Sequence, residues 1–169
     1  MNSTKAMTAE DMEIRTDRMR FIKNNLSANL ALLAILFDVF YFVTVYRQDV
    51  GSYYYNIIIG ASIIYNLLFM LTVFLCSEGV KNYKKNYSLI LFVVGVLQLV
   101  RIMILPMKAH VATTLIQNEE VRVMSDGQFM SLVVFLVASA VCCILAAAVN
   151  WSRCRQLEEH MNKLAAKTA

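Results

Sequence analysis

The sequence contains four long apolar segments separated by polar stretches. They cover residues 26–46, 54–75, 87–105 and 129–151, and the third stops before Pro106, the only proline. Crossing about 30 Å of hydrocarbon takes roughly 20 helical residues, and no segment alternates with the period of two that marks a barrel strand. We therefore expect an all-α fold, a polytopic membrane protein built as a four-transmembrane-helix bundle.

The composition agrees with this pattern. The chain has 169 residues, of which 59% are hydrophobic and 17% charged, whereas a soluble domain is about 45–50% apolar and about 25% charged. One proline and five glycines speak against a disordered or loop-rich chain. Four cysteines without paired spacing are too few for the disulfide framework of a small secreted fold.

The distribution of lysine and arginine predicts the orientation in the membrane. Residues 1–25, the loop between the second and third segments and the tail 152–169 together hold twelve of them, whereas the two opposite loops hold Arg47, Lys108 and Arg122. Positively charged flanks resist translocation. We therefore expect both termini to be cytoplasmic in a plasma membrane, with a short outer loop and a longer one at 106–128. The net charge of +4 is then an asymmetry across the membrane, and it indicates no nucleic-acid partner.

Both cytoplasmic ends carry apolar residues at helical spacing. In residues 1–25 and just beyond, one helical face holds Met12, Met19, Ile22 and Leu26, which predicts an amphipathic helix at the membrane surface. The tail 152–169 carries a second seam made of Cys154, Leu157, Met161 and Leu164. We expect the fourth helix to continue into the cytoplasm, where this seam packs either on the N-terminal helix or on a helix of a partner.

The outer loop 106–128 is too apolar for a free linker, because it contains Val111, Leu115, Ile116, Val121, Val123 and Met124. A turn at Ser125, Asp126 and Gly127 precedes the fourth apolar segment. We expect a short amphipathic segment that lies on the outer membrane surface or against a partner.

Two charged side chains interrupt the apolar segments, Asp38 in the first and Arg101 in the third. A charged side chain in hydrocarbon costs at least about 2.5 kcal/mol on insertion scales, so each needs a partner. With both termini on one side, the two segments run in the same direction and carry these residues at depths that agree to within about one helical turn. We therefore expect Asp38 and Arg101 to contact each other.

Further polar residues share faces with this pair and predict a polar layer in the outer half of the bundle. Gln98 lies one turn from Arg101 on the third segment, and the second segment contributes Tyr55, Asn56, Ser62 and Asn66. Three interpretations remain open. The layer is a proton or ion site in which Asp38 titrates, or it is a buried ion pair that fixes which helices pack together. Alternatively, Arg101 reaches the outer interface, and Asp38 contacts the asparagines or another subunit.

The fourth segment differs from the others by its small residues. They form two rows at four-residue spacing, one of Ala138, Cys142 and Ala146 and the other of Ser139, Cys143 and Ala147. Such rows let helix backbones approach closely, so we expect the tightest helix contact here, within the bundle or between chains. The two cysteines are then packing residues.

No constellation of catalytic residues is visible. The chain has no glycine-rich phosphate loop and no hydrolase or zinc-protease motif, and we predict no metal site and no cofactor. Its two histidines, His110 and His160, lie outside the apolar segments and cannot ligate a haem inside the bundle. A thiol oxidoreductase would need a redox pair, and adjacent cysteines such as Cys142 and Cys143 lack the Cys-X-X-Cys geometry.

These observations favour a non-catalytic membrane protein, an accessory or interaction subunit of a larger membrane assembly such as a transporter complex. Its partners would be the lipid bilayer and either another membrane protein or a second copy of the chain. The alternative is a small transporter or channel that uses Asp38 and Arg101. Four helices enclose little space, so this alternative requires a homo-oligomer with the polar layer at its axis.

Overall fold

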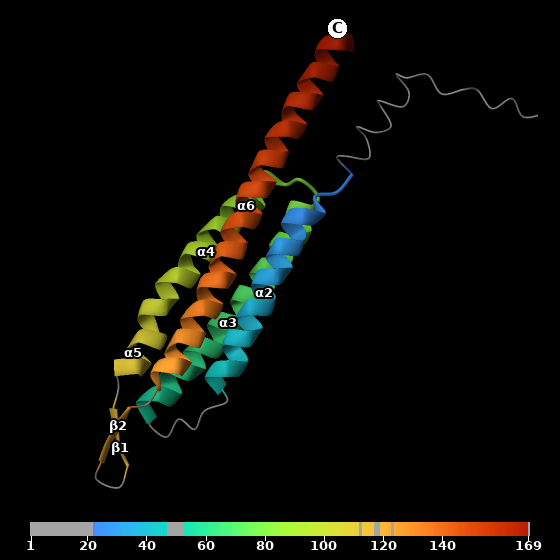
Figure 1. Cartoon of the computed structure of the whole chain (residues 1–169). Helices are drawn as coiled ribbons and strands as arrows, with labels where there is room; N and C mark the ends of the chain where they lie inside the picture. The colour runs from blue at the N-terminus through green and yellow to red at the C-terminus, as the bar shows by residue number, and fades with distance from the viewer. Residues whose placement is uncertain (1–21, 47–52, 112, 117–118, 123, 169) are drawn as a thin grey trace, which may run out of the picture.

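A computed structural model describes residues 22–46, 53–111, 113–116, 119–122 and 124–168, and the following statements concern these residues. They form five helices and one two-stranded sheet (Figure 1). The elements are α2 (Asn25–Tyr46), α3 (Tyr53–Lys81), α4 (Lys85–Ile104), α5 (Pro106–Val111), β1 (Thr113–Ile116), β2 (Glu119–Arg122) and α6 (Asp126–Thr168). Residues 1–21 of the amphipathic N-terminal helix expected within residues 1–25 lie outside the described residues. Residues 22–24 are not helical, so Ile22 precedes α2 and Leu26 belongs to α2 rather than to a helix that continues from residue 12.

Four of these helices, α2, α3, α4 and α6, are long and apolar enough to cross a membrane, which confirms the predicted fold class at this level. Large apolar side chains such as Leu67, Leu71 and Leu89 point outward and are more than half exposed. A surface of this kind suits a multi-pass helical bundle whose surroundings are lipid rather than water.

Two helices extend well beyond the apolar segments that predicted them. Helix α3 continues to Lys81, and α6 starts at Asp126 and continues to Thr168. An apolar segment marks the part of a helix that suits hydrocarbon, whereas the backbone hydrogen bonds continue until a cap or turn interrupts them. In Figure 1 the end of α6 therefore projects past the other helices.

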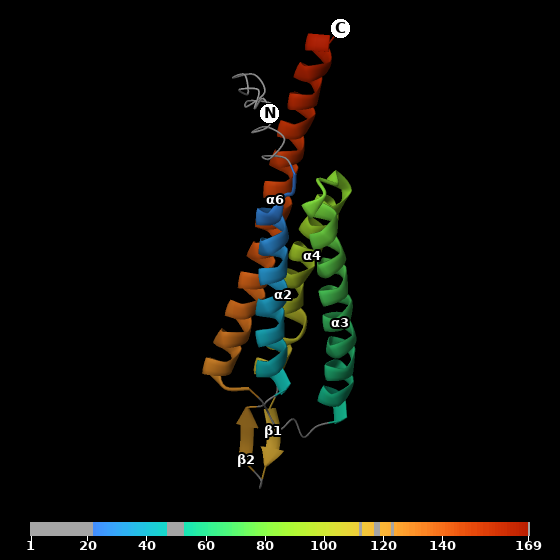
Figure 2. The same cartoon turned by 90° about the vertical axis from the view of Figure 1, so that its right-hand side faces the viewer.

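The four long helices form a ring in which each packs on two others: α6 packs along α2 and α4, and α3 packs on α2 and α4 (Figures 1 and 2). Small residues line the α2–α6 contact, and Ala31, Ala34 and Ala146 are completely buried in it. Two hydroxyl groups donate across this contact to backbone carbonyls, Ser27 to Ala146 at 2.6 Å and Ser139 to Ala34 at 2.9 Å. These bonds fix the antiparallel register of the two helices.

The two small-residue rows of α6 pack inside this chain. Ser139, Cys142, Cys143, Ala146 and Ala147 are buried, and Ala138 is partly buried. Gly95 of α4 lies opposite: a Cβ atom there would come within 2.9 Å of the Ile144 side chain and 3.2 Å of the Ala140 carbonyl oxygen. The rows therefore serve the contacts of α6 with α2 and α4.

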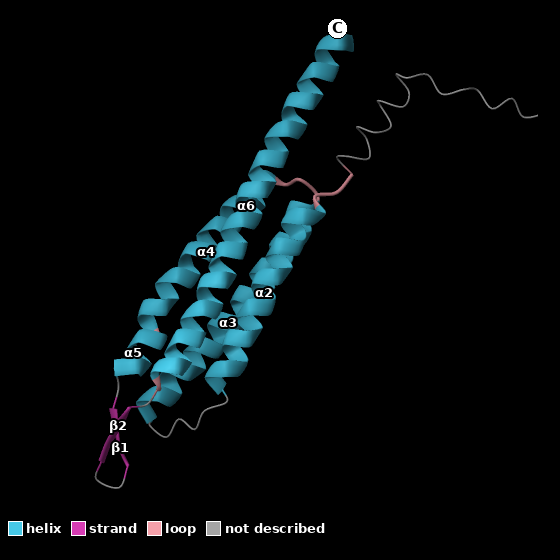
Figure 3. Cartoon of the chain, in the orientation of Figure 1, coloured by secondary structure: helices cyan, strands magenta, loops and turns pink. Residues whose placement is uncertain are grey.

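The outer connection forms the short helix α5 and an antiparallel hairpin, which is the one departure from all-helical structure among the described residues (Figure 3). Its register pairs Thr113 with Arg122 and Ile116 with Glu119. β-Branched residues, including Thr113, Thr114 and Val121, favour strands here. The amphipathic character of this segment, and its position on the membrane surface or against a partner, remain predictions.

Replacing Gly95 with alanine should separate α4 from α6 and lower the free energy of unfolding by about 1 to 3 kcal/mol, the usual cost of overpacking a core. Reversible unfolding in detergent measures the change. Gly60→Ala is the matched control, because nothing lies within 4 Å of a Cβ atom at this helical glycine. Equal stability of the two variants would contradict close packing at Gly95.

Candidate functional site

The structure places the side chains of Asp38 on α2 and Arg101 on α4 in contact, as their matched depths predict. The Arg101 Nη1 atom donates to Asp38 Oδ1 at 3.2 Å, and Gln98 Nε2 donates to the same oxygen at 3.0 Å. Only 5% of the Arg101 side chain and none of the Asp38 side chain is exposed. The Asp38 carboxylate thus receives two hydrogen bonds from α4 inside the bundle.

Ser62 and Tyr65 of α3, together with Tyr41 of α2, complete the surroundings of the guanidinium group. Arg101 Nη2 donates to the Ser62 hydroxyl oxygen at 2.9 Å. The rings of Tyr41 and Tyr65 lie 4.3 Å and 4.7 Å from the guanidinium carbon, close enough for cation–π attraction. A delocalised, weakly hydrated guanidinium group suits such aromatic surroundings better than an ammonium group does. One arginine thereby links α2, α3 and α4.

Part of the hydrogen-bonding capacity of this layer is unused by the described residues. Asp38 Oδ2, Arg101 Nε, the Tyr41 hydroxyl group and both polar atoms of the Asn66 amide are buried and have no hydrogen-bond partner among them. The layer therefore combines a buried ion pair with polar atoms, two of them belonging to that pair, that retain donor and acceptor capacity.

The predicted polar layer is assembled in part. Asp38, Gln98, Arg101 and Ser62 come together, and Asn66 is buried one turn from Ser62 on α3. The side chains of Tyr55 and Asn56 lie outside the described residues. Because Arg101 is buried and paired, it does not extend to the outer interface in this structure.

The sequence pattern did not indicate the two tyrosines of the site. Tyr41 follows Asp38 by three residues and Tyr65 follows Ser62 by three residues, so each shares a helical face with a residue of the predicted layer. Tyrosine also occurs at membrane interfaces and in cores. The i, i+3 spacing was the only sequence signal for these tyrosines, and it does not distinguish a tyrosine of the polar layer from one at a membrane interface or in an apolar core.

A second buried polar cluster joins the helices at the opposite end of the bundle. Asn24 Nδ2 donates to Asn150 Oδ1 at 3.0 Å, and Asn150 Nδ2 donates to the Ser88 hydroxyl oxygen at 2.7 Å. The backbone N–H of Asn24 donates to the Lys81 carbonyl oxygen at 3.0 Å. Contacts between α6, α4, the start of α2 and the end of α3 therefore meet at two fully buried asparagines that the sequence pattern had not assigned to a polar contact.

The same cluster holds the turn between α3 and α4 against α6. Tyr83 adopts a positive φ of 57° in this turn, and the Cys154 thiol donates to its carbonyl oxygen at 3.1 Å. One turn further along α6, Glu158 lies 3.5 Å from the Lys85 ammonium group. The base of the projecting part of α6 is thereby fixed to the bundle.

Neither polar cluster has the composition of a metal centre. Within the described ranges, no group of three or more histidine, cysteine, aspartate or glutamate side chains is placed to hold a metal ion. Cys76, Cys142, Cys143 and Cys154 are free thiols and buried. The chemistry that this geometry supports is hydrogen bonding and ion pairing between helices.

Comparison of the chain with protein-family models, with curated proteins and with solved structures found no match. What the described residues show is a bundle of four helices long and apolar enough to cross a membrane, with a buried ion pair between α2 and α4 and a buried asparagine pair between the start of α2 and α6.

Asp38→Asn should lower the free energy of unfolding by about 3 to 5 kcal/mol, because it leaves the buried Arg101 charge without its counter-charge. The double variant Asp38→Asn, Arg101→Met removes both charges and should recover most of this loss. Reversible unfolding in detergent measures all three proteins.

Glu158→Gln is the control, because it removes an ion pair whose side chains are 40% and 59% exposed and should cost less than about 1 kcal/mol. An Asp38→Asn variant as stable as the wild type would show that the ion pair does not hold the bundle together.

Proposed function

We propose that this chain is a non-catalytic integral membrane protein that acts as an accessory or interaction subunit of a larger membrane assembly, such as a transporter complex. We further propose that it lies in the plasma membrane with both termini in the cytoplasm. Its partner would be another membrane protein, bound through the projecting part of α6.

One observation carries this proposal: α6 is a single helix of 43 residues, whereas α4 has 20. At 1.5 Å per residue it is about 64 Å long, roughly twice the thickness of the hydrocarbon core. Both views of the fold show its last turns beyond the ends of the other helices (Figures 1 and 2). We infer that a helix that continues so far beyond its own bundle offers a surface to another protein.

The apolar seam supports a helical partner for this surface. Cys154 is buried against the α3–α4 turn and Leu157 is partly buried, but Met161, the next residue of the seam, is 57% exposed. An apolar seam on a cytoplasmic helix is stable when another helix covers it. The N-terminal segment of the same chain remains the other candidate to cover it.

The distribution of basic residues supports the proposed topology. Lys81, Lys84 and Lys85 surround the turn between α3 and α4, at the end of the bundle from which α6 projects (Figure 1). Arg153 and Arg155 follow on α6 itself. A concentration of lysine and arginine at one end of a bundle marks the cytoplasmic side.

A second candidate is the small oligomeric transporter, and the unpartnered polar atoms of Asp38 and Asn66 favour it. The position of the ion pair counts against it. A solute path between copies needs polar groups on an outer face of each chain, whereas Asp38 and Arg101 face the interior of one bundle. The ion pair is therefore better explained as a contact that holds α2 and α4 together.

Photo-crosslinking tests the interaction function. A photoreactive residue at Met161, on the seam, should yield a light-dependent adduct of discrete mass with another membrane protein. The same residue at Asn162, about 100° around the helix and also exposed, should yield little. Mass spectrometry of the adducts identifies what is joined. Equal adducts at both positions, or adducts to the N-terminal segment of the same chain alone, would contradict the proposal; adducts between copies would favour the second candidate.

Labelling with a membrane-impermeant maleimide tests the topology. Lys108→Cys, exposed on α5, should react in intact cells, whereas Lys163→Cys, exposed near the end of α6, should react only after the membrane is opened. The four native cysteines are buried and should contribute little background. The reverse pattern would show that the termini face outward.

A further inference from the structure

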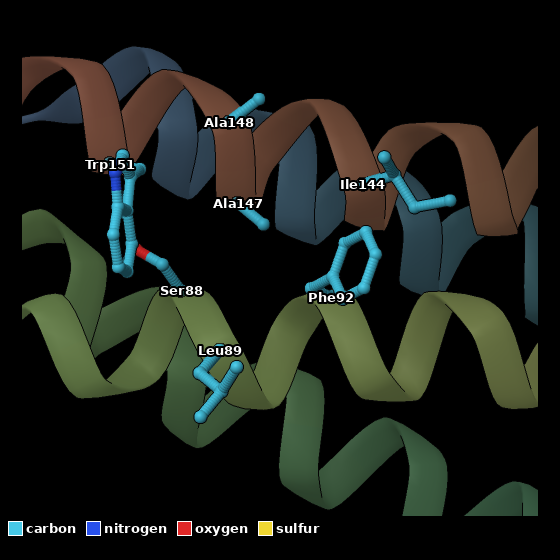
Figure 4. Close-up of a pocket in the computed structure, with 7 residues that line it drawn as sticks. All are labelled: Ser88, Leu89, Phe92, Ile144, Ala147, Ala148 and Trp151. Atoms are coloured by element: carbon cyan, nitrogen blue, oxygen red, sulfur yellow. The ribbon is translucent and has the colours of Figure 1, made fainter.

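An apolar groove runs between α4 and α6 at the end of the bundle from which α6 projects. Figure 4 shows Trp151 and Ser88 at one end of it and Phe92 and Ile144 at the other. Leu89, Ala147 and Ala148 complete the lining, and the groove has a volume of about 280 Å³. Ser88 is the only polar residue of this lining, and its hydroxyl oxygen accepts a hydrogen bond from Asn150 at 2.7 Å.

The shape of the groove suits a chain of methylene groups. The α6 residues that line it, from Ile144 to Trp151, extend over about 10 Å along the helix. The groove is a slot beside small alanine side chains, and the neighbouring outward face of α4 carries the bulky residues Leu89, Phe92 and Val93. Close approach of a second helix needs a row of small residues on both partners, which this face of α4 lacks.

Two basic residues, Lys85 and Arg155, lie near the end of the groove at Trp151. The Lys85 ammonium group lies 4.9 Å from the centre of the Trp151 ring. Arg155 follows Trp151 by four residues, so it lies one turn further along the same face of α6, and it is exposed. Lys85 also contacts Glu158 at 3.5 Å, but both side chains of this pair are substantially exposed, and such pairs are weak.

We propose that this groove binds one acyl chain of an anionic phospholipid, with Lys85 and Arg155 binding the phosphate of its headgroup. Two observations combine in this assignment: an apolar slot that extends along about 10 Å of α6, and two basic residues beside its Trp151 end. Tryptophan at the rim is typical of the membrane–water interface. The lipid belongs to the membrane leaflet at the basic end of the bundle.

Because Trp151 is the only tryptophan of the chain, its fluorescence reports on this groove alone. The full-length protein is reconstituted in phosphatidylcholine vesicles in which a fixed share of the lipid is either brominated phosphatidylglycerol or brominated phosphatidylcholine. Bromine on an acyl chain quenches tryptophan on contact. We expect the relative association constant at Trp151 to be about fivefold higher for the anionic lipid for each cation that contacts it.

Two variants and a control test the assignment of the headgroup site. Arg155→Gln, which leaves the contact between Lys85 and Trp151 in place, should reduce the preference for phosphatidylglycerol. The double variant Lys85→Gln, Arg155→Gln should abolish it. Lys81→Gln removes the same charge from α3, which contributes no residue to the lining of the groove, and should leave the preference unchanged. Circular dichroism confirms that each variant is folded.

The outcomes are distinct. Equal quenching by both brominated lipids in the wild type would overturn the proposal, because the groove would then bind acyl chains without regard to the headgroup. Weak quenching by either lipid would also overturn it, because a second copy of the chain or another protein would then cover the groove. A preference that survives the double variant would exclude Lys85 and Arg155 as the phosphate site.

Discussion

The burial of the Arg101 guanidinium group among apolar helices constrains the arrangement of the whole bundle. A charge in hydrocarbon needs a counter-charge, hydrogen-bond acceptors and polarisable neighbours, and no single helix supplies all three. Asp38 comes from α2, and the Ser62 hydroxyl group and the Tyr65 ring come from α3. Because these contacts are directional, helices α2, α3 and α4 are held in one relative rotation and depth.

Two kinds of contact hold the helices together. Polar side chains join them at two depths, and small residues pack between those depths. In the half of the bundle away from the projecting end of α6, Asp38 and Arg101 join α2 to α4; at the end where α6 projects, Asn24 and Asn150 join the same helices to α6. Between these depths, small side chains and hydroxyl-to-carbonyl hydrogen bonds bring α6 close to α2. Dispersion contacts and hydrogen bonds are the main forces that associate helices in lipid, where the hydrophobic effect between them is absent.

The polar clusters connect helices to one another, and within the layer around Asp38 and Arg101 the atoms that retain hydrogen-bonding capacity are Asp38 Oδ2, Arg101 Nε, the Tyr41 hydroxyl group and the Asn66 amide. The features that face outward are the projecting end of α6 and the groove beside Trp151. The first is the surface that we propose for a protein partner, and the second is the one that we propose for a lipid.

The apolar segments of the sequence predicted the four helices, because an apolar segment of this length has few stable alternatives in a membrane. The depths of Asp38 and Arg101 predicted their contact, since helix direction and depth follow from spacing along the chain, but the sequence left open the alternative in which Arg101 reaches the outer interface. Which side chains surround that pair, and that Asn24 meets Asn150 across the bundle, were decided by the tertiary structure alone. The physical reason is that spacing along a helix gives the face and depth of a residue, whereas its partner depends on the rotation of neighbouring helices, and only packing sets that rotation.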